Sequence, residues 1–141
     1  MSIAEVASLV STTEPINVPV KTVTVTVHRL FESPMGNLPN YYLRVSDTAM
    51  AMEEPELYKI VWNLTVDTGV ESAVFADPGV IFAEAGAPFL RSSRTPDTIE
   101  GYWSNMEMKN RRSFPYTLYV MVDNSVVVHD PTVENQPPLA G

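Results

Sequence analysis

Residues 21–28, Lys-Thr-Val-Thr-Val-Thr-Val-His, alternate valine and threonine with a period of two. Successive side chains of a β-strand point to opposite faces of a sheet, so the valines share one face and the threonines share the other. β-branched residues of both kinds also favour the extended backbone. The segment therefore predicts a strand whose valines face a hydrophobic core.

Two later segments repeat this alternation. In residues 58–66, apolar side chains alternate with polar ones, which predicts a strand with Trp62 as its main core residue. Every second residue from Phe114 to Val122 is aromatic or aliphatic, which predicts another strand, and Asp123-Asn124 can form a tight connection to a following strand at 125–129. Both segments predict sheets that bury one face.

The remaining strand candidates are shorter. Asp77-Pro78-Gly79 predicts a turn between strands at 73–76 and 80–83, because proline presets the first central dihedral and glycine accepts a positive one. Weaker strand patterns occupy residues 41–45 and 99–108. We count about seven or eight short strands, without the strand–helix alternation that is typical of parallel sheets.

This count predicts an all-β fold, and specifically an antiparallel immunoglobulin-like β-sandwich. A small β-barrel is the alternative, since the pattern is the same whether two sheets pack together or one sheet closes on itself. At 141 residues the chain has the length of one domain. We expect a single domain over residues 1–141, with the sandwich at 16–130.

The first residues predict a short helix at 2–11. Ser2 and Glu5 have the spacing of a capping box, in which each side chain satisfies an amide at the helix start. Three apolar residues then share one face of this helix: Ile3, Val6 and Val10. So short a helix is marginal alone, so we expect this face to pack on the domain or on a neighbouring subunit.

The last residues, 131–141, predict an extended tail. Pro131 stiffens the exit from the preceding strand, and Pro137 with the proline after it disfavours a helix. Val133 offers an apolar anchor for holding this tail against a protein surface. We expect the tail to act as a strap, docked on its own domain or on another copy.

Charge and hydropathy exclude several partners. Seventeen acidic against nine basic side chains give a net charge of -8, which opposes approach to phosphate backbones and anionic lipid. No run reaches the length of about 18 apolar residues that marks a membrane span. We therefore expect no nucleic-acid partner and no membrane insertion. The N-terminus lacks the basic region of a signal peptide, which predicts a cytoplasmic protein or one exported without a cleaved signal.

The residues available for chemistry are few. The chain has no cysteine, which removes thiolate nucleophiles and thiolate metal sites, and its only histidines are His28 and His129. No serine stands between glycines at a strand–helix turn, and no glycine-rich loop could hold phosphates. The acidic run at 53–56 reads as a solvated loop. We expect no metal site, no cofactor and no enzymatic activity.

One basic cluster, Lys109-Asn110-Arg111-Arg112, lies where we expect a turn between two strands. It can meet an acidic patch such as 53–56 on another copy. Together with the apolar residues of both termini, it supplies the candidate partner contacts. These are Ile3, Val6, Val10, Lys109, Arg111, Arg112, Val133 and Pro137.

The expected function is a non-catalytic structural or protein-interaction β-sandwich that self-associates as a homo-oligomer or binds another protein. Sandwiches expose sheet edges that must be paired or protected, and the terminal segments of this chain are suited to reaching a neighbour. The alternative is a small-ligand or carbohydrate-binding module that uses the loops at 31–40 and 84–97.

Overall fold

The computed structural model describes residues 18–30, 40–105 and 112–135, which form strands joined by turns with no helix among them. The strands follow one another along the chain as β1 (Val20–Leu30), β2 (Asn40–Val45), β3 (Ala49–Met52), β4 (Leu57–Val66), β5 (Val74–Phe82), β6 (Phe89–Arg94), β7 (Thr98–Ser104), β8 (Arg112–Val122), β9 (Ser125–His129) and β10 (Thr132–Asn135). The predicted all-β class is confirmed. The predicted helix at 2–11 lies outside the described residues.

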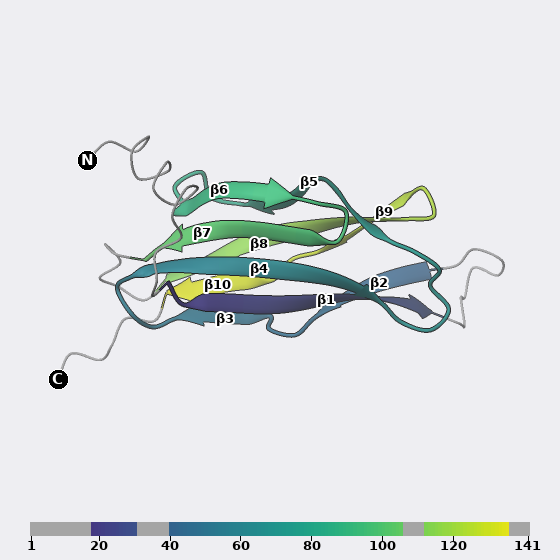
Figure 1. The fold of residues 1–141 in the computed structure, drawn as a ribbon, viewed down its shortest axis with the longest axis horizontal. Helices are drawn as coiled ribbons and strands as arrows, with labels where there is room; N and C mark the ends of the chain where they lie inside the picture. The colour runs from purple at the N-terminus through teal and green to yellow at the C-terminus, as the bar shows by residue number, and fades with distance from the viewer. Residues whose placement is uncertain (1–17, 31–39, 106–111, 136–141) are drawn as a thin grey trace.

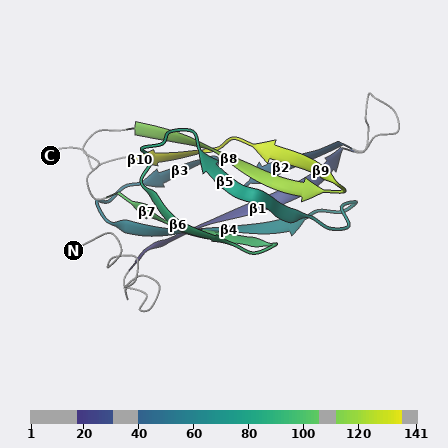
Figure 2. The same cartoon turned by 90° about the horizontal axis from the view of Figure 1, so that it is seen from above.

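The strands form two sheets (Figure 1). The first sheet has the order β2-β1-β4-β7-β6, and the second has the order β3-β10-β8-β5, with β9 also paired to β8. The sheets lie as two layers in Figure 2, where β4 and β7 are below β8 and β10, and one sheet is curled into a half-barrel. The arrangement is sandwich-like, with the core between the layers.

Two of the strand pairs are parallel, so the predicted wholly antiparallel sandwich is wrong in this respect. β1 pairs with β4 in parallel over Val20–Val27 and Lys59–Val66, and β10 pairs with β3 in parallel. Parallel neighbours need a long connection, and here each connection passes through strands of the other sheet. The local alternation gives a strand's two faces but not the direction of its neighbour.

β5 is one strand with a bulge, so the predicted turn at Asp77-Pro78-Gly79 is wrong. The pairing of β5 with β8 shifts register between Phe75 and Val80, which is how extra residues are accommodated within a strand. Gly79 has a φ of 84°. A side chain there would meet Arg94 Cδ and Ile99 Cδ1 at 2.9 Å, so glycine also permits the close approach of β5 to the first sheet.

The expected tight connection at Asp123-Asn124 is confirmed. Both residues have positive φ, 48° and 64°, as a two-residue hairpin turn between twisted strands requires. The Tyr41 hydroxyl of β2 donates a hydrogen bond to Asp123 Oδ2 at 2.5 Å. This contact connects the β2 edge of the first sheet to the hairpin of the second.

The C-terminal segment is a strand inside the second sheet, where β10 lies between β3 and β8. β9 and β10 pair with β8 at the same offset, so residues 125–135 run beside β8 with one interruption at Asp130-Pro131. The extended path is confirmed for 132–135, and the remaining residues to 141 lie outside the described part. The predicted end of the sandwich at residue 130 is wrong, because β10 is an internal strand.

The core joins the two sheets through aromatic side chains. Trp62 in β4 is fully buried, and its indole N–H donates to the Tyr116 hydroxyl of β8 at 3.1 Å. Burial raises the pKa of Tyr116 to about 12, so this phenol keeps its proton across the neutral range. Phe82 of β5 packs on both Tyr116 and Trp103. The expectation that Trp62 is a core residue is confirmed.

Replacing Trp62 by alanine should lower the free energy of unfolding by about 3–5 kcal/mol, because it opens a large cavity between the sheets and leaves the Tyr116 hydroxyl without its donor. Chemical denaturation followed by circular dichroism measures this. The control is Val20→Ala, at a position that is 55% exposed, which should cost less than about 0.5 kcal/mol. Equal losses in the two variants would contradict the assignment of Trp62 to the core.

Ending the chain after Asp130 should remove β10 and destabilise the domain by at least about 2 kcal/mol from the burial of Val133 alone. Ending it after Asn135 retains β10 and is the matched control. Thermal unfolding of the two truncated chains compares them directly. Similar melting temperatures would show that the domain does not depend on β10.

Candidate functional site

The structure describes two of the predicted partner contacts. Arg112 is exposed, forms an ion pair with Glu84, and has its guanidinium carbon 4.7 Å from the centroid of the Phe114 ring. Val133 is fully buried in β10, so its side chain belongs to the core of its own domain. The other predicted contacts lie outside the described residues: Ile3, Val6, Val10, Lys109, Arg111 and Pro137.

The segment predicted as a loop at 84–97 contains strand β6, so that expectation is wrong over Phe89–Arg94. Arg94 donates to the Phe75 carbonyl at 3.1 Å and lies 3.7 Å from Asp77 Oδ1, which holds the end of β6 against the β5 bulge. The other proposed ligand loop, at 31–40, is outside the described residues except for Asn40, the first residue of β2.

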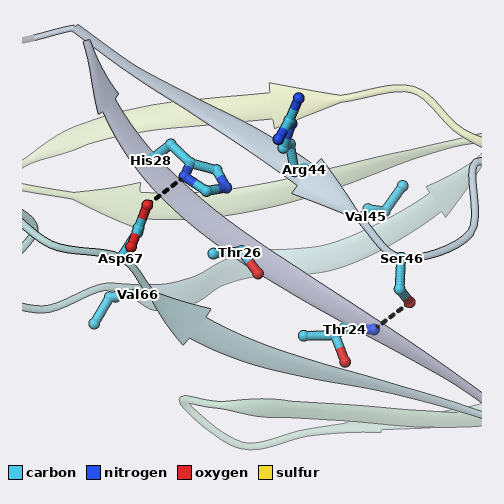
Figure 3. A pocket seen from close by; sticks show the side chains of 8 residues that line it. All are labelled: Thr24, Thr26, His28, Arg44, Val45, Ser46, Val66 and Asp67. Atoms are coloured by element: carbon cyan, nitrogen blue, oxygen red, sulfur yellow. Dashed lines mark hydrogen bonds and ion pairs between the residues drawn. The ribbon is translucent and has the colours of Figure 1, made fainter.

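A polar groove lies instead on the outer face of the first sheet (Figure 3). Its floor is formed by Thr24, Thr26 and His28, which alternate along β1 with the buried valines. Residues 44–46 border it on the β2 side, and residues 66–67 border it at the end of β4. The hollow has a volume of about 310 Å³. We call this surface the polar groove.

An oriented histidine stands at one end of the polar groove. His28 Nδ1 is 2.8 Å from Asp67 Oδ2, and the imidazole stacks on the Tyr42 ring with centroids 5.1 Å apart. A hydrogen bond from the Thr68 backbone N–H and, next, the contact with His28 hold the pKa of the Asp67 carboxyl below its ordinary value. The ionised carboxylate accepts only, so Nδ1 carries the hydrogen and Nε2 is left for other partners.

Hydroxyl groups occupy the middle of the polar groove. Thr26 Oγ1 lies 3.0 Å from Thr65 Oγ1 of β4, and Thr65 Oγ1 lies 3.5 Å from the Val25 carbonyl. The Ser46 hydroxyl accepts a hydrogen bond from the Thr24 backbone N–H at 2.9 Å. Arg44 is exposed beside them, and no residue of the described ranges forms a hydrogen bond or ion pair with its guanidinium.

The polar groove combines a cationic, an imidazole and several hydroxyl side chains on one surface. A nucleophilic triad needs a hydroxyl bonded to the second nitrogen of the histidine, whereas the Thr26 hydroxyl contacts Thr65 Oγ1 and the Ser46 hydroxyl accepts from the Thr24 backbone N–H. Within the same described ranges no three histidine, aspartate or glutamate side chains gather as metal ligands. The groove therefore offers one cation, one oriented imidazole and several hydroxyls to a ligand.

A second candidate surface covers the outer face of the second sheet. We call it the apolar face, and it is defined by Val74, Ile81, Tyr119, Met121, Val126 and Val128. Val74, Met121 and Val126 are cross-strand neighbours on β5, β8 and β9, and Tyr119 is paired with Val128. Val126 is 54% exposed and Val128 is 51% exposed. β9 thus presents two valines to solvent while Val127 packs on the core.

The acidic loop after β3 is held from within by a residue that sequence patterns do not single out. Asn105 is buried; its amide donates to the Met52 and Glu54 carbonyls, and its oxygen accepts from the Trp103 indole. The Glu54 N–H also donates to the Tyr58 hydroxyl at 2.8 Å. Sequence patterns place Asn105 inside the expected strand at 99–108 and give it no separate role. These contacts organise the loop at 53–56.

Comparison with models of known protein families gives no match for this chain, and comparison with curated proteins gives no significant one. Among the described residues, no helix is long and apolar enough to cross a membrane.

The low pKa of Asp67 predicts a pH-dependent contribution of the His28–Asp67 pair to stability. A carboxyl with a lowered pKa in the folded state stabilises the fold above its ordinary pKa of about 3.9, and this stabilisation is lost as the pH falls through the folded-state pKa. Asp67→Asn should therefore be less stable than the natural chain near neutral pH, and the difference should shrink under strongly acidic conditions. Denaturant midpoints measured across this range test the expectation, with Asp97→Asn as control.

Proposed function

We propose that this protein is a non-catalytic interaction module that self-associates through the apolar face. What supports the proposal is the exposure of four β-branched side chains on β5 and β9, the two strands that flank β8, from 42% for Val74 to 54% for Val126. A monomer gains nothing from presenting these side chains to water, whereas contiguous exposed apolar patches mark interaction sites.

The net charge of the chain makes two copies repel each other, so a second copy can occupy this face only if the contact surface is itself uncharged. Copies with a net charge of -8 repel each other, and the six side chains that define the apolar face carry no charge. Sheets pack face to face about 10 Å apart with interdigitating side chains, and β-branched residues suit such packing. The proposed contact is therefore a face-to-face pairing of two second sheets.

We also propose that the fold is an immunoglobulin-like sandwich and that the protein is cytoplasmic. The repeated crossing of the chain between two sheets and a tryptophan buried between them support an immunoglobulin-like sandwich. The net charge of -8 makes copies repel each other in solution and supports a cytoplasmic location.

The double variant Val126→Lys/Val128→Lys should remain a monomer at concentrations at which the natural chain associates. Both positions are exposed edge-strand positions, where lysine is tolerated in a monomer but would be desolvated in a face-to-face contact. Sedimentation velocity over a concentration series gives the mass of each species, and circular dichroism checks that the variant keeps its fold.

The matched control is Val20→Lys, which places lysine at an equally exposed valine of the first sheet, and it should associate like the natural chain. The milder pair Val126→Thr/Val128→Thr should weaken association while keeping the branching at Cβ. A natural chain that stays monomeric throughout the series, or a Val20→Lys variant that is equally impaired, would argue against the apolar face as the contact.

A further inference from the structure

We propose that the polar groove binds a small carboxylate ligand that also carries hydroxyl groups, such as a sugar acid. The groove lies on the sheet opposite the apolar face, so this site is independent of self-association. Its volume of about 310 Å³ is at the lower end of the range for small-molecule sites, about 300–1,000 Å³. The net charge of -8 disfavours a large polyanion.

Arg44 selects the carboxylate. Its guanidinium borders the groove without a hydrogen-bonding or ionic partner in the described ranges. By contrast, Arg94 and Arg112 are each placed against a carboxylate of their own chain. A planar guanidinium presents paired N–H donors that match the two oxygens of a carboxylate.

The other groups of the groove select hydroxyls, because they include both acceptors and donors. Asp67 fixes a hydrogen of His28 on Nδ1, so whenever the imidazole is neutral its Nε2 is left as an acceptor. When Thr65 donates to the Val25 carbonyl and Thr26 donates to Thr65, the Thr26 oxygen is left as a second acceptor.

Ser46 adds a donor on the opposite border of the groove. Its oxygen already accepts from the Thr24 N–H, so its own hydrogen is available to a ligand oxygen. An arginine for a carboxylate, two acceptors for hydroxyl hydrogens and one hydroxyl donor form a pattern that a simple anion or a neutral sugar would satisfy only in part.

The test is a titration of the full chain with D-glucuronate, followed by the amide chemical shifts of the protein. We expect saturable shifts at residues 24–28 and 44–46, with a dissociation constant on the order of 1 mM because the groove is open. D-glucose lacks the carboxylate and acetate lacks the hydroxyls, so each should bind at least about tenfold more weakly. No saturable shift at the groove, or equal binding of all three probes, would overturn the proposal.

Two matched pairs of variants assign the contacts. Arg44→Gln should weaken glucuronate binding by about tenfold or more, whereas Arg112→Gln removes the same charge away from the groove and should leave binding unchanged. Thr26→Val should weaken binding, whereas Thr22→Val, on the same strand but outside the groove, should not. Unchanged binding in both Arg44→Gln and Thr26→Val would exclude this site even if glucuronate binds elsewhere.

Discussion

The parallel pairing of β1 with β4 is the constraint on which the core and the polar groove both depend. Within β1, the alternating valines enter the core while the threonines and His28 face outward. The register with β4 then places Thr26 beside Thr65 and brings the end of β4 to His28, so that Asp67 can reach the imidazole. A register shifted by one residue would turn Trp62 out of the core and separate the His28–Asp67 pair.

In the second sheet, β8 contributes to both surfaces: one of its faces packs in the core, and the other belongs to the apolar face. Its inward residues include Tyr116, whose hydroxyl accepts from Trp62 and so joins the two sheets at their centre. Its outward residues, Tyr119 and Met121, lie between the exposed side chains of β5 and β9 and make the apolar face continuous. The packing of the core and the continuity of the apolar face therefore both depend on the alternation of side chains along β8.

Local patterns in the sequence predicted the longest strands, but not β3 or β6 and not the partners of any strand. The alternations around Val23, Trp62 and Leu118 identified β1, β4 and β8, because the two-residue period of a strand can be recognised from neighbouring residues alone. Proline followed by glycine indicates both a turn and a bulge, so Asp77-Pro78-Gly79 was misassigned.

The candidate sites required longer-range information. The His28–Asp67 pair joins residues 39 positions apart, and only the strand pairing brings them together. The tail was predicted to dock, but the strand order was needed to place Val133 inside the sheet. Asn105 was not recognised, because a single polar residue within an expected strand does not indicate which carbonyl groups it will bind.

The outer faces of the two sheets differ in polarity, and the difference is largest between β1 and β9. In β1 the outward positions from Thr22 to His28 are polar, as expected for a sheet face in contact with water. In β9, Val126, Val127 and Val128 are consecutive valines, so the outward positions are as apolar as the inward one. Packing within the domain accounts for Val127 only. The outward valines weaken the preference for one register, which is a cost to the folding of an isolated copy. A contact outside the domain gives them a physical role, and such a contact leaves the polar groove on the opposite sheet open to a ligand.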